Sequence, residues 1–353
     1  MAGYTREYLS ERHTHYEEKF NDWNFHLRSY LGGQDYQNGY HLNRYVLETD
    51  EEYLKRASNT PVDNHCKNVV QIYSSFLFRV PPTRDYGSLT GDAQLESFIN
   101  DADLDGRSFN NIIREMQVNA SVYGTCWAIL DKPKTVTNTR AEELQQDIRP
   151  YLSIYTPENV LNWKYERLNN GRFYLTSLTL LEDLINDDAI IKVWTLEDIC
   201  TYRINEFKKE YAVTKPILLD EVPNALGEIP AVCLYNQKSQ RRGIGISDLN
   251  DVAEMQQSIY NDYSEIEQVI RLSNHPSLVK TPNVEASAGA GSIIEMPEDL
   301  DPNLKPYIIQ PSSQSLDSIM NNINMKVEAI NRITHMGAVR SSTDRVQSGI
   351  ALQ

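Results

Sequence analysis

Apolar side chains recur every three or four positions in two long segments toward the C-terminal end of the chain. Ser247 is a suitable N-cap for a first helix of about 24 residues, whose apolar face comprises Leu249, Val252, Met255, Ile259, Tyr263, Ile266 and Ile270. A second helix is predicted from Ser315 to a stop at Gly337, and its apolar face comprises Leu316, Ile319, Ile323, Val327 and Ile330.

The segment between these two helices has the pattern of a small β-rich module. Leu278–Val279, Ile293–Ile294 and Tyr307–Ile309 are short apolar runs, and Ala288–Gly291 is a turn sequence. Helix is disfavoured there, and the strands are kept short, by Pro276, Pro282, Pro297, Pro302 and Pro306. We therefore predict two long helices that bracket a compact β module.

The first part of the chain is helical by pattern, and the middle part alternates with a period of two. Residues 34–50 look irregular, and helices are predicted over 4–31, from Pro61, over 95–104 and over 109–122. Strands are predicted over 124–130, 151–155, 173–181, 189–196, 199–204 and 231–235, with a hairpin turn at 169–171. The predicted fold class is α+β.

Composition and charge exclude some classes of protein. The 353-residue chain has no apolar run long enough for a membrane-spanning helix, and its N-terminus lacks the apolar core of a signal peptide. A net charge of −15 argues against a protein that reads DNA sequence through basic patches, but not against a surface past which DNA slides. Four scattered cysteines predict reduced, buried thiols and synthesis in the cytoplasm.

One short motif imitates a calcium-binding loop. Asp101, Asp103, Asp105 and Gly106 match the start of an EF-hand, but the twelfth position is Ile112 instead of a bidentate Glu. An Asp-rich turn that caps the next helix is the favoured interpretation, and a calcium-binding enzyme is the alternative. No nucleophile motif, phosphate loop or metal-ligand spacing is recognisable, so no catalytic residue, metal or cofactor is predicted.

The two helical faces carry more apolar surface than the segment between them is able to cover. The rest of the chain is able to cover some of this surface, and neighbouring copies of the same chain are a source of the remaining cover, because each buried side chain contributes about 1.5–3 kcal/mol. We predict that subunit packing uses Leu249, Val252, Met255, Ile259, Ile266, Leu316, Ile319 and Ile323.

The order of these parts resembles a tailed-bacteriophage portal protein. Portal proteins of this type have G-x-(I/V)-P, a hydrophobic strand ending in Asn, and then S-D-L opening a long helix. The chain has Gly227–Asn236 (GEIPAVCLYN) followed by Gly245–Val252 (GISDLNDV). Looser similarities are Asn68–Pro82, Val122–Trp127, Ser273–Leu278, Gly289–Pro297 and Ser348–Leu352.

The resemblance implies a set of domains. Residues 1–243 would be a mixed α/β wing, residues 244–271 and 312–336 the two stem helices, and residues 272–311 the clip. Residues 337–353 would hold a tunnel loop and the start of a further helix. Portal proteins continue from there into a crown, and the crown is absent here. Either the sequence is truncated or the protein is unusually short, and we expect truncation.

The resemblance also implies a function without chemistry. The chain would form a ring, usually of twelve copies, at one vertex of the capsid in the virion. The ring would be the channel for packaging and ejection of double-stranded DNA, and it would bind capsid protein, terminase and then a head–tail adaptor. Another head–tail connector is the alternative within this class. No membrane is involved.

Two sets of candidate site residues follow from that assignment. The tunnel loop would present Arg340, Ser341, Ser342, Thr343, Asp344 and Arg345 to the DNA. The two arginines either touch the DNA backbone or pair with Asp344 or a neighbouring subunit. In the clip, the exposed candidates for partner docking are Lys280, Glu285, Glu295, Glu298 and Asp299.

Overall fold

The computed structural model describes residues 4–133, 139–167, 169, 171–209, 214–274, 277–279, 307–309 and 314–337. The chain divides into two compact units. Unit 1 is Met1–Leu31 with Cys66–Ala253, and unit 2 is Gly32–His65 with Glu254–Gln353. In this division residues 32–65 group with the long helices, and the predicted wing, stem and clip domains stay a prediction.

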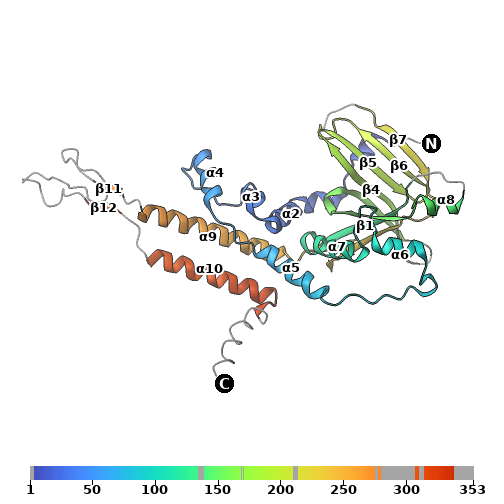
Figure 1. The fold of residues 1–353 in the computed structure, drawn as a ribbon. Coiled ribbons are helices and arrows are strands. Elements are labelled where there is room, and N and C mark those ends of the chain that lie inside the picture. Colours follow the sequence, from blue (N-terminus) through green and yellow to red (C-terminus); the bar gives the residue numbers. More distant parts are fainter. Residues whose placement is uncertain are drawn as a thin grey trace, which may run out of the picture. The chain divides into compact units, whose positions relative to one another are not determined.

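A five-stranded antiparallel sheet in the order β3-β4-β5-β6-β7 dominates unit 1 (Figure 1). Its strands are β3 (Val160–Arg167), β4 (Phe173–Ile185), β5 (Asp188–Thr195), β6 (Asp198–Ile204) and β7 (Ile217–Pro223). Alternate residues of β5 and β6 are buried, and the register pairs Ile191 with Tyr202 and Val193 with Cys200. Because side chains alternate across a strand, this pattern places one face of the sheet in the core.

A second sheet of unit 1 has the order β2-β1-β8 and is antiparallel throughout. Its strands are β1 (Thr125–Asp131), β2 (Tyr151–Tyr155) and β8 (Ala231–Tyr235), and a small pair, β9 (Gln237–Lys238) with β10 (Gly245–Ile246), follows. Helix α7 (Phe109–Tyr123) packs on β1 through a core that includes Ile112, Met116, Cys126 and Ala128. Strands β1, β2 and β8 agree with predicted strands, whereas β9 and β10 were not predicted.

The helices of unit 1 correct one prediction. Instead of a single helix over 4–31, the chain forms α1 (Arg6–Ser10) and α2 (Thr14–Leu31). The break occurs because Glu11 is extended and the His13 N–H donates to the carbonyl of Leu161, with the His13 ring stacked 4.1 Å from that of Trp163. The other helices are α5 (His65–Leu77), α6 (Ala93–Asn100) and α8 (Arg140–Gln145), together with the 3₁₀ turns η1 (Gly87–Leu89) and η2 (Pro157–Asn159).

Unit 2 contains α3 (Gly33–Gln37), α4 (Asp50–Asn59), α10 (Gln314–Ile333) and most of α9 (Asn250–Asn274). Strands β11 (Ser277–Val279) and β12 (Tyr307–Ile309) pair antiparallel. The two long helices and these two strands confirm the sequence pattern, whereas α3 contradicts the irregular segment expected over 34–50 and α4 was not predicted. Helix α4 forms because Thr49 and Glu52 make a complete capping box at its start.

Several predicted helix ends are wrong. Helix α5 begins at His65 instead of Pro61, and α6 ends at Asn100 instead of residue 104. Helix α9 begins at Asn250, because the Ser247 hydroxyl donates to the carbonyls of Ser121 and Val122 in unit 1. Helix α10 ends at Ile333, before Gly337, since His335 takes the left-handed conformation (φ 57°) and the Met336 N–H donates to the Asn331 carbonyl.

Two further predictions concern the cysteines and membrane-spanning helices. All four cysteines are free thiols; three are buried and Cys233 is half-buried. In the described part of the chain, no helix combines the length and apolar character needed to cross a bilayer.

Gly124 marks a close approach of two backbones in unit 1. It caps α7 with φ 87°, and a Cβ there would lie 2.6 Å from the carbonyl oxygen of Gly245. A Cβ at Gly106, which has φ 89°, would meet nothing within 4 Å. Gly124 therefore combines a steric constraint with a conformational one, and Gly106 carries only the second.

We expect Gly124→Ala to lower the free energy of unfolding more than Gly106→Ala. Both variants force alanine into the left-handed region at about 1–2 kcal/mol, and Gly124→Ala adds roughly 1–3 kcal/mol of overpacking. Urea denaturation followed by tryptophan fluorescence measures this, because Trp23, Trp127, Trp163 and Trp194 all lie in unit 1. Equal losses for the two variants would contradict the close approach.

Candidate functional site

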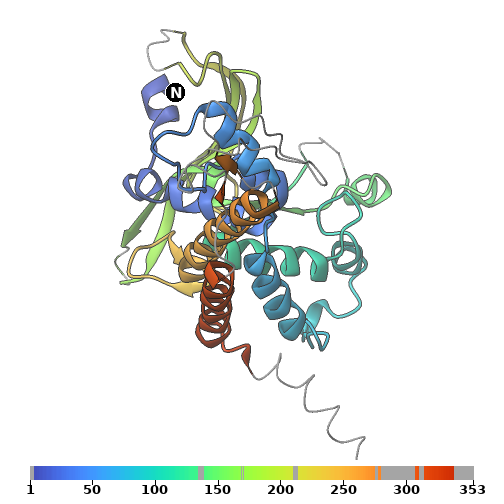
Figure 2. The ribbon, with the colours of Figure 1, turned by 90° about the vertical axis from the view of Figure 1, so that its left-hand side faces the viewer.

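Helices α9 and α10 lie side by side and run in opposite directions within unit 2 (Figures 1 and 2). An ion pair between Asp262 and Lys326 joins them, and Asn322 donates a 3.0 Å hydrogen bond to the same carboxylate. Both charged side chains are less than one-fifth exposed. On α10 the side chains of Ile323 and Ile330 are buried. The helix pair is thus held by an apolar seam and a partly shielded polar contact.

The segment of residues 32–65 packs against α9 in the same unit. Tyr36, Leu42, Tyr53, Ala57 and Tyr260 form one buried cluster. The Tyr260 hydroxyl donates to the Ala57 carbonyl at 3.0 Å, and the Tyr53 hydroxyl donates to the Leu42 carbonyl at 3.2 Å. Burying a tyrosine requires a partner for its hydroxyl, and both hydroxyls here have one.

Arg56 connects the 32–65 segment to α9 through a buried ion pair. Its Nε and Nη2 each donate to a different carboxylate oxygen of Glu48 at 2.7 Å. The two side chains are only 4% and 6% exposed. Nη1 donates to the Ser264 hydroxyl on α9 at 2.9 Å, and Nη2 also donates to the Asn43 carbonyl at 2.8 Å.

This arrangement is rigid because nearly every donor of the guanidinium has a fixed acceptor. Removing one partner of such a buried pair typically costs about 3–5 kcal/mol, since the other charge is left without compensation. The hydrogen bonds from Arg56 hold the pKa of Glu48 below its usual range.

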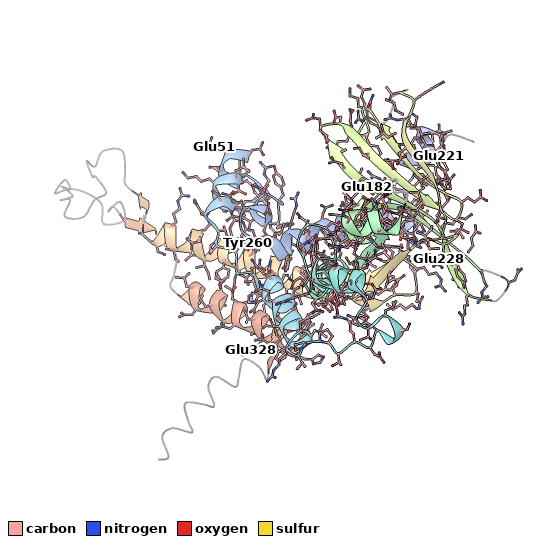
Figure 3. The ribbon with its side chains drawn as sticks, turned by 45° about the vertical axis from the view of Figure 1, so that its right-hand side comes forward. Glu51, Glu182, Glu221, Glu228, Tyr260 and Glu328 are labelled. Atoms are coloured by element: carbon pink, nitrogen blue, oxygen red, sulfur yellow. The ribbon has the colours of Figure 1, made fainter. Side chains whose placement is uncertain are left out.

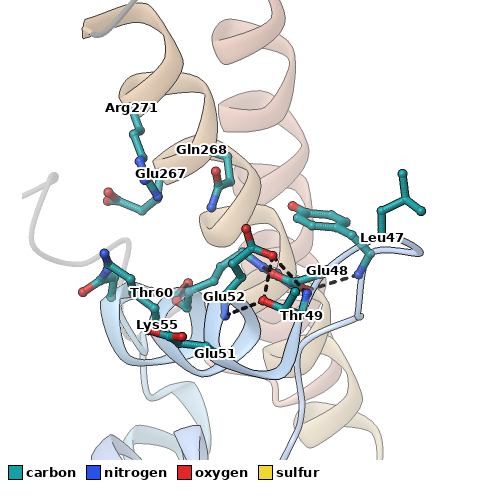
Figure 4. A pocket seen from close by; sticks show the side chains of 13 residues that line it. Leu47, Glu48, Thr49, Glu51, Glu52, Lys55, Thr60, Glu267, Gln268 and Arg271 are labelled. Atoms are coloured by element: carbon teal, nitrogen blue, oxygen red, sulfur yellow. Dashed lines mark hydrogen bonds and ion pairs between the residues drawn. The ribbon is translucent and has the colours of Figure 1, made fainter.

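A groove of about 970 Å³ runs between α4 and the C-terminal half of α9 (Figure 4). Glu51, Glu52 and Lys55 line it from α4, and Glu267 and Arg271 line it from α9. Figure 4 shows the capping hydrogen bonds between Thr49 and Glu52 at its edge. The mixture of both charge signs suits a polar macromolecular contact better than a small apolar ligand.

Unit 1 has a second hollow of about 410 Å³ between α2 and residues 239–250. His26 lines it, and burial lowers the pKa of this histidine to about 4, so its ring is neutral at pH 7. Lys19 is paired with Asp22 at 2.7 Å on the same helix. The imidazole and this ion pair are therefore neutral or internally compensated, and they offer no acid–base couple.

The Phage portal protein, SPP1 Gp6-like family model matches residues 14–328. The chain belongs to this family. No curated protein sequence matches it. The family is one of structural proteins that form oligomeric rings associated with the phage capsid and the terminase, so this portal chain has a place in the virion.

The structure places the predicted subunit-packing residues of this portal chain unevenly. Five of the eight are already covered in a single copy, each at most 8% exposed: Leu249, Val252, Ile259, Ile266 and Ile323. Met255, Leu316 and Ile319 are half-buried. The 32–65 segment, of which residues 34–50 were expected to be irregular, supplies apolar cover in unit 2. The use of these residues in packing between copies stays a prediction.

The other predicted site residues lie outside the described residues. These are the tunnel-loop set, Arg340, Ser341, Ser342, Thr343, Asp344 and Arg345, and the clip set, Lys280, Glu285, Glu295, Glu298 and Asp299. The structure therefore says nothing of how either set is arranged.

The Asp101 and Asp103 carboxylates of the Asp-rich motif form hydrogen bonds and ion pairs with other groups of the same chain. Asp103 accepts hydrogen bonds from the Asp105 and Arg107 N–H groups and pairs with the Arg107 guanidinium. Asp101 accepts from the Gly106 N–H and pairs with Arg149 at 2.7 Å. The turn does not cap the next helix, because Ser108 is the N-cap of α7.

These contacts weaken the calcium alternative. Among the described residues, the one group of His, Cys, Asp and Glu side chains with mutually close ligand atoms is Asp198, Cys200 and Glu221 on β6 and β7. The Asp101–Asp105 motif is not such a group.

Pattern reasoning missed Arg56 and Glu48, a tightly held charged pair of unit 2. The local signals were present, because Thr49-x-x-Glu52 is a capping-box sequence and Tyr53 and Ala57 have helical spacing. The position of the partner on α9, some 208 residues away in sequence, had no such signal.

We expect Glu48→Gln to flatten the acid dependence of unit 2. The folded-state pKa of Glu48 lies below its unfolded value of about 4.3. The pair therefore stabilises the fold above that pH, and this contribution is lost as the pH falls through the folded-state pKa. The introduced glutamine does not titrate, so protection of α4 amides in hydrogen-exchange mass spectrometry should fall less from about pH 5 to pH 3.

The matched control is Glu254→Gln, a change at an exposed position of unit 2 on α9. It should retain the wild-type dependence on pH. Parallel curves for Glu48→Gln and wild type would contradict the role assigned to the Arg56–Glu48 pair.

Proposed function

We propose that the chain forms a closed ring at one capsid vertex, through which double-stranded DNA is packaged and ejected. The ring also serves as the docking site for terminase and then for a head–tail adaptor. The observation that carries this proposal is the family match over residues 14–328, which includes α9, most of α10 and the 32–65 segment. The expected number of copies is about twelve, the common number in the family the sequence resembles.

In this proposal α9 and α10 are the stem, and β11 and β12 are the base of the clip. The 25 residues of α9 span about 37 Å and the 20 residues of α10 about 30 Å at 1.5 Å per residue. The β11–β12 pairing supports a module that returns the chain to its starting point, since Ser277 lies opposite Ile309. The clip candidates Lys280, Glu285, Glu295, Glu298 and Asp299 follow β11 in sequence and precede β12.

Net charge supports a conduit in preference to a DNA-binding ring. Each chain carries −15, so twelve copies carry about −180. DNA affinity arises largely from Lys and Arg side chains that neutralise phosphates. A ring with an excess of carboxylates repels the phosphates, and DNA therefore slides without sticking.

We expect the purified chain to assemble into closed rings with a central hole of duplex-DNA width in electron micrographs. Native mass spectrometry of the same sample should give one dominant ring mass, with twelve copies expected. Helix faces packed between identical copies favour one closed number, because each subunit presents the same pair of surfaces to its neighbours. A chain that stays monomeric across the accessible protein concentrations would contradict the proposal.

The tunnel-loop proposal has a separate test. If Arg340 and Arg345 contact the DNA backbone transiently, the double variant Arg340→Ala/Arg345→Ala should assemble rings but package or retain less DNA in an in vitro packaging assay. The physical reason is the loss of two positive charges per copy from a surface that is otherwise acidic. Normal packaging and retention by the double variant would instead favour pairing of these arginines with Asp344 or a neighbouring subunit.

A further inference from the structure

Unit 2 exposes a two-residue apolar turn just before α4. The Glu48 N–H donates to the Tyr45 carbonyl at 3.2 Å, which places Val46 and Leu47 at the centre of the turn. These two side chains are 99% and 94% exposed. Turn centres normally carry Gly, Pro, Asn, Asp or Ser, and adjacent apolar side chains held in water indicate a surface meant for a contact.

Contacts of Tyr45 and Arg44 with α9 and α4 fix the position of this turn. The Tyr45 hydroxyl donates to Glu265 on α9 at 2.6 Å, and the Arg56 guanidinium lies 4.2 Å from the centre of the Tyr45 ring. Arg44 pairs with Asp50 at 2.6 Å. Leu47 lines the same groove as Glu52 and Lys55, and Figure 4 shows it at the edge of that groove. A contact residue fixed in this way loses little conformational entropy on binding.

Next to this turn, α4 presents a polar row with an apolar side chain beside it. Glu51 and Lys55 are one helical turn apart, both are exposed, and Leu54 beside them is also exposed. Within the described part of the chain, neither Glu51 nor Lys55 has an ion pair.

Helix α10 presents a matching row on the other side of the same unit. Glu328 and Arg332 are also one turn apart and exposed, and among the described residues neither is paired. Met325, 69% exposed, lies one turn before Glu328, and the half-exposed Ile333 follows Arg332. Figure 3 shows Glu51 and Glu328 on opposite sides of the helix that carries Tyr260, and Figure 2 shows α4 and α10 on opposite sides of α9.

Two different surfaces on opposite sides of one unit are what a ring of identical subunits requires, because each head-to-tail interface joins one surface to the other. The two rows are complementary in charge when α4 and α10 run in opposite directions. Glu51 then faces Arg332, and Lys55 faces Glu328. In the same alignment the Val46–Leu47 turn lies toward the C-terminal end of α10, where Ile333 is exposed, and Leu54 lies within about one helical turn of the level of Met325.

We propose that the outward face of α10 in one copy docks along α4 and the Val46–Leu47 turn of the next copy. This inference rests on the proposed ring, and it names the surfaces by which adjacent subunits recognise each other. The occupant of the groove between α4 and α9 is accordingly α10 of the neighbouring chain. The two charge rows set the direction of the helix in the groove, and the apolar turn anchors it.

The test is a charge-reversal cycle on assembly, measured by mass photometry and native mass spectrometry against protein concentration at low salt. Glu51→Arg and Arg332→Glu should each raise the concentration at half assembly by roughly two- to fivefold for each interface, as exposed ion pairs do. The double variant Glu51→Arg/Arg332→Glu restores opposite charges at every interface and should recover most of the loss. Added salt should reduce all these differences.

Glu228→Arg is the matched control, since it reverses one exposed carboxylate in unit 1 and should assemble as wild type does. A second variant, Val46→Asp/Leu47→Asp, should abolish rings. Hydrogen exchange in α4 and α9 should stay as in wild type, because both side chains are almost fully exposed in a single copy and have almost no buried surface that the substitution would remove.

The outcomes separate this inference from the proposed function. Wild-type chains that form no rings would overturn the proposed function and the inference with it. Wild-type rings together with normal assembly of Val46→Asp/Leu47→Asp would overturn the inference alone. Single charge reversals that match Glu228→Arg, or losses that the double variant fails to recover, would also overturn it. So would a turn variant that forms rings but loses binding of terminase or an adaptor.

Discussion

Unit 2 depends on one buried ion pair. Arg56 and Glu48 are almost entirely covered by the protein, yet both are charged, so their desolvation has to be offset by close and complete hydrogen bonding. The guanidinium meets this condition with two bonds to the carboxylate, one to Ser264 on α9 and one to the Asn43 carbonyl. A single side chain thereby ties the start of α4, the turn before it and the long helix into one rigid group.

That rigidity keeps the Val46 and Leu47 side chains exposed in a fixed position. Two apolar side chains on a mobile loop would collapse onto the nearest apolar surface, whereas here the backbone on both sides is fixed by Tyr45, Arg44 and the capping box of α4. In a protein of a ring-forming family, a fixed apolar anchor on one side of the unit and an exposed methionine with complementary charges on the other make a coherent pair of surfaces. The chain's acidic charge is compatible with this, because the recognition proposed here pairs opposite charges locally within an acidic whole.

Much of the secondary structure was predictable because its causes are local. The helical spacing of α9 and α10 and the alternation in β4, β5 and β6 appear directly in the sequence. The misses have physical causes too. Ser247 was expected to cap α9, but its hydroxyl is used by two carbonyls more than 120 residues away. Helical spacing did not predict the end of α10. His335 has a positive φ although it is not a glycine, and the helix ends before the nearby Gly337.

The amino-acid sequence by itself determined the class of the chain, its long helices, its acidic charge and its resemblance to portal proteins, because periodicity, composition and motif order are properties of the chain in one dimension. Only the tertiary structure decided which apolar side chains remain exposed. Leu249, Ile259 and Ile323 had the pattern of an interface and are buried in a single copy, whereas Val46 and Leu47 had no pattern at all and are almost fully exposed. Exposure depends on what the distant parts of the chain cover, and the 32–65 segment covers α9 through contacts that no local spacing encodes.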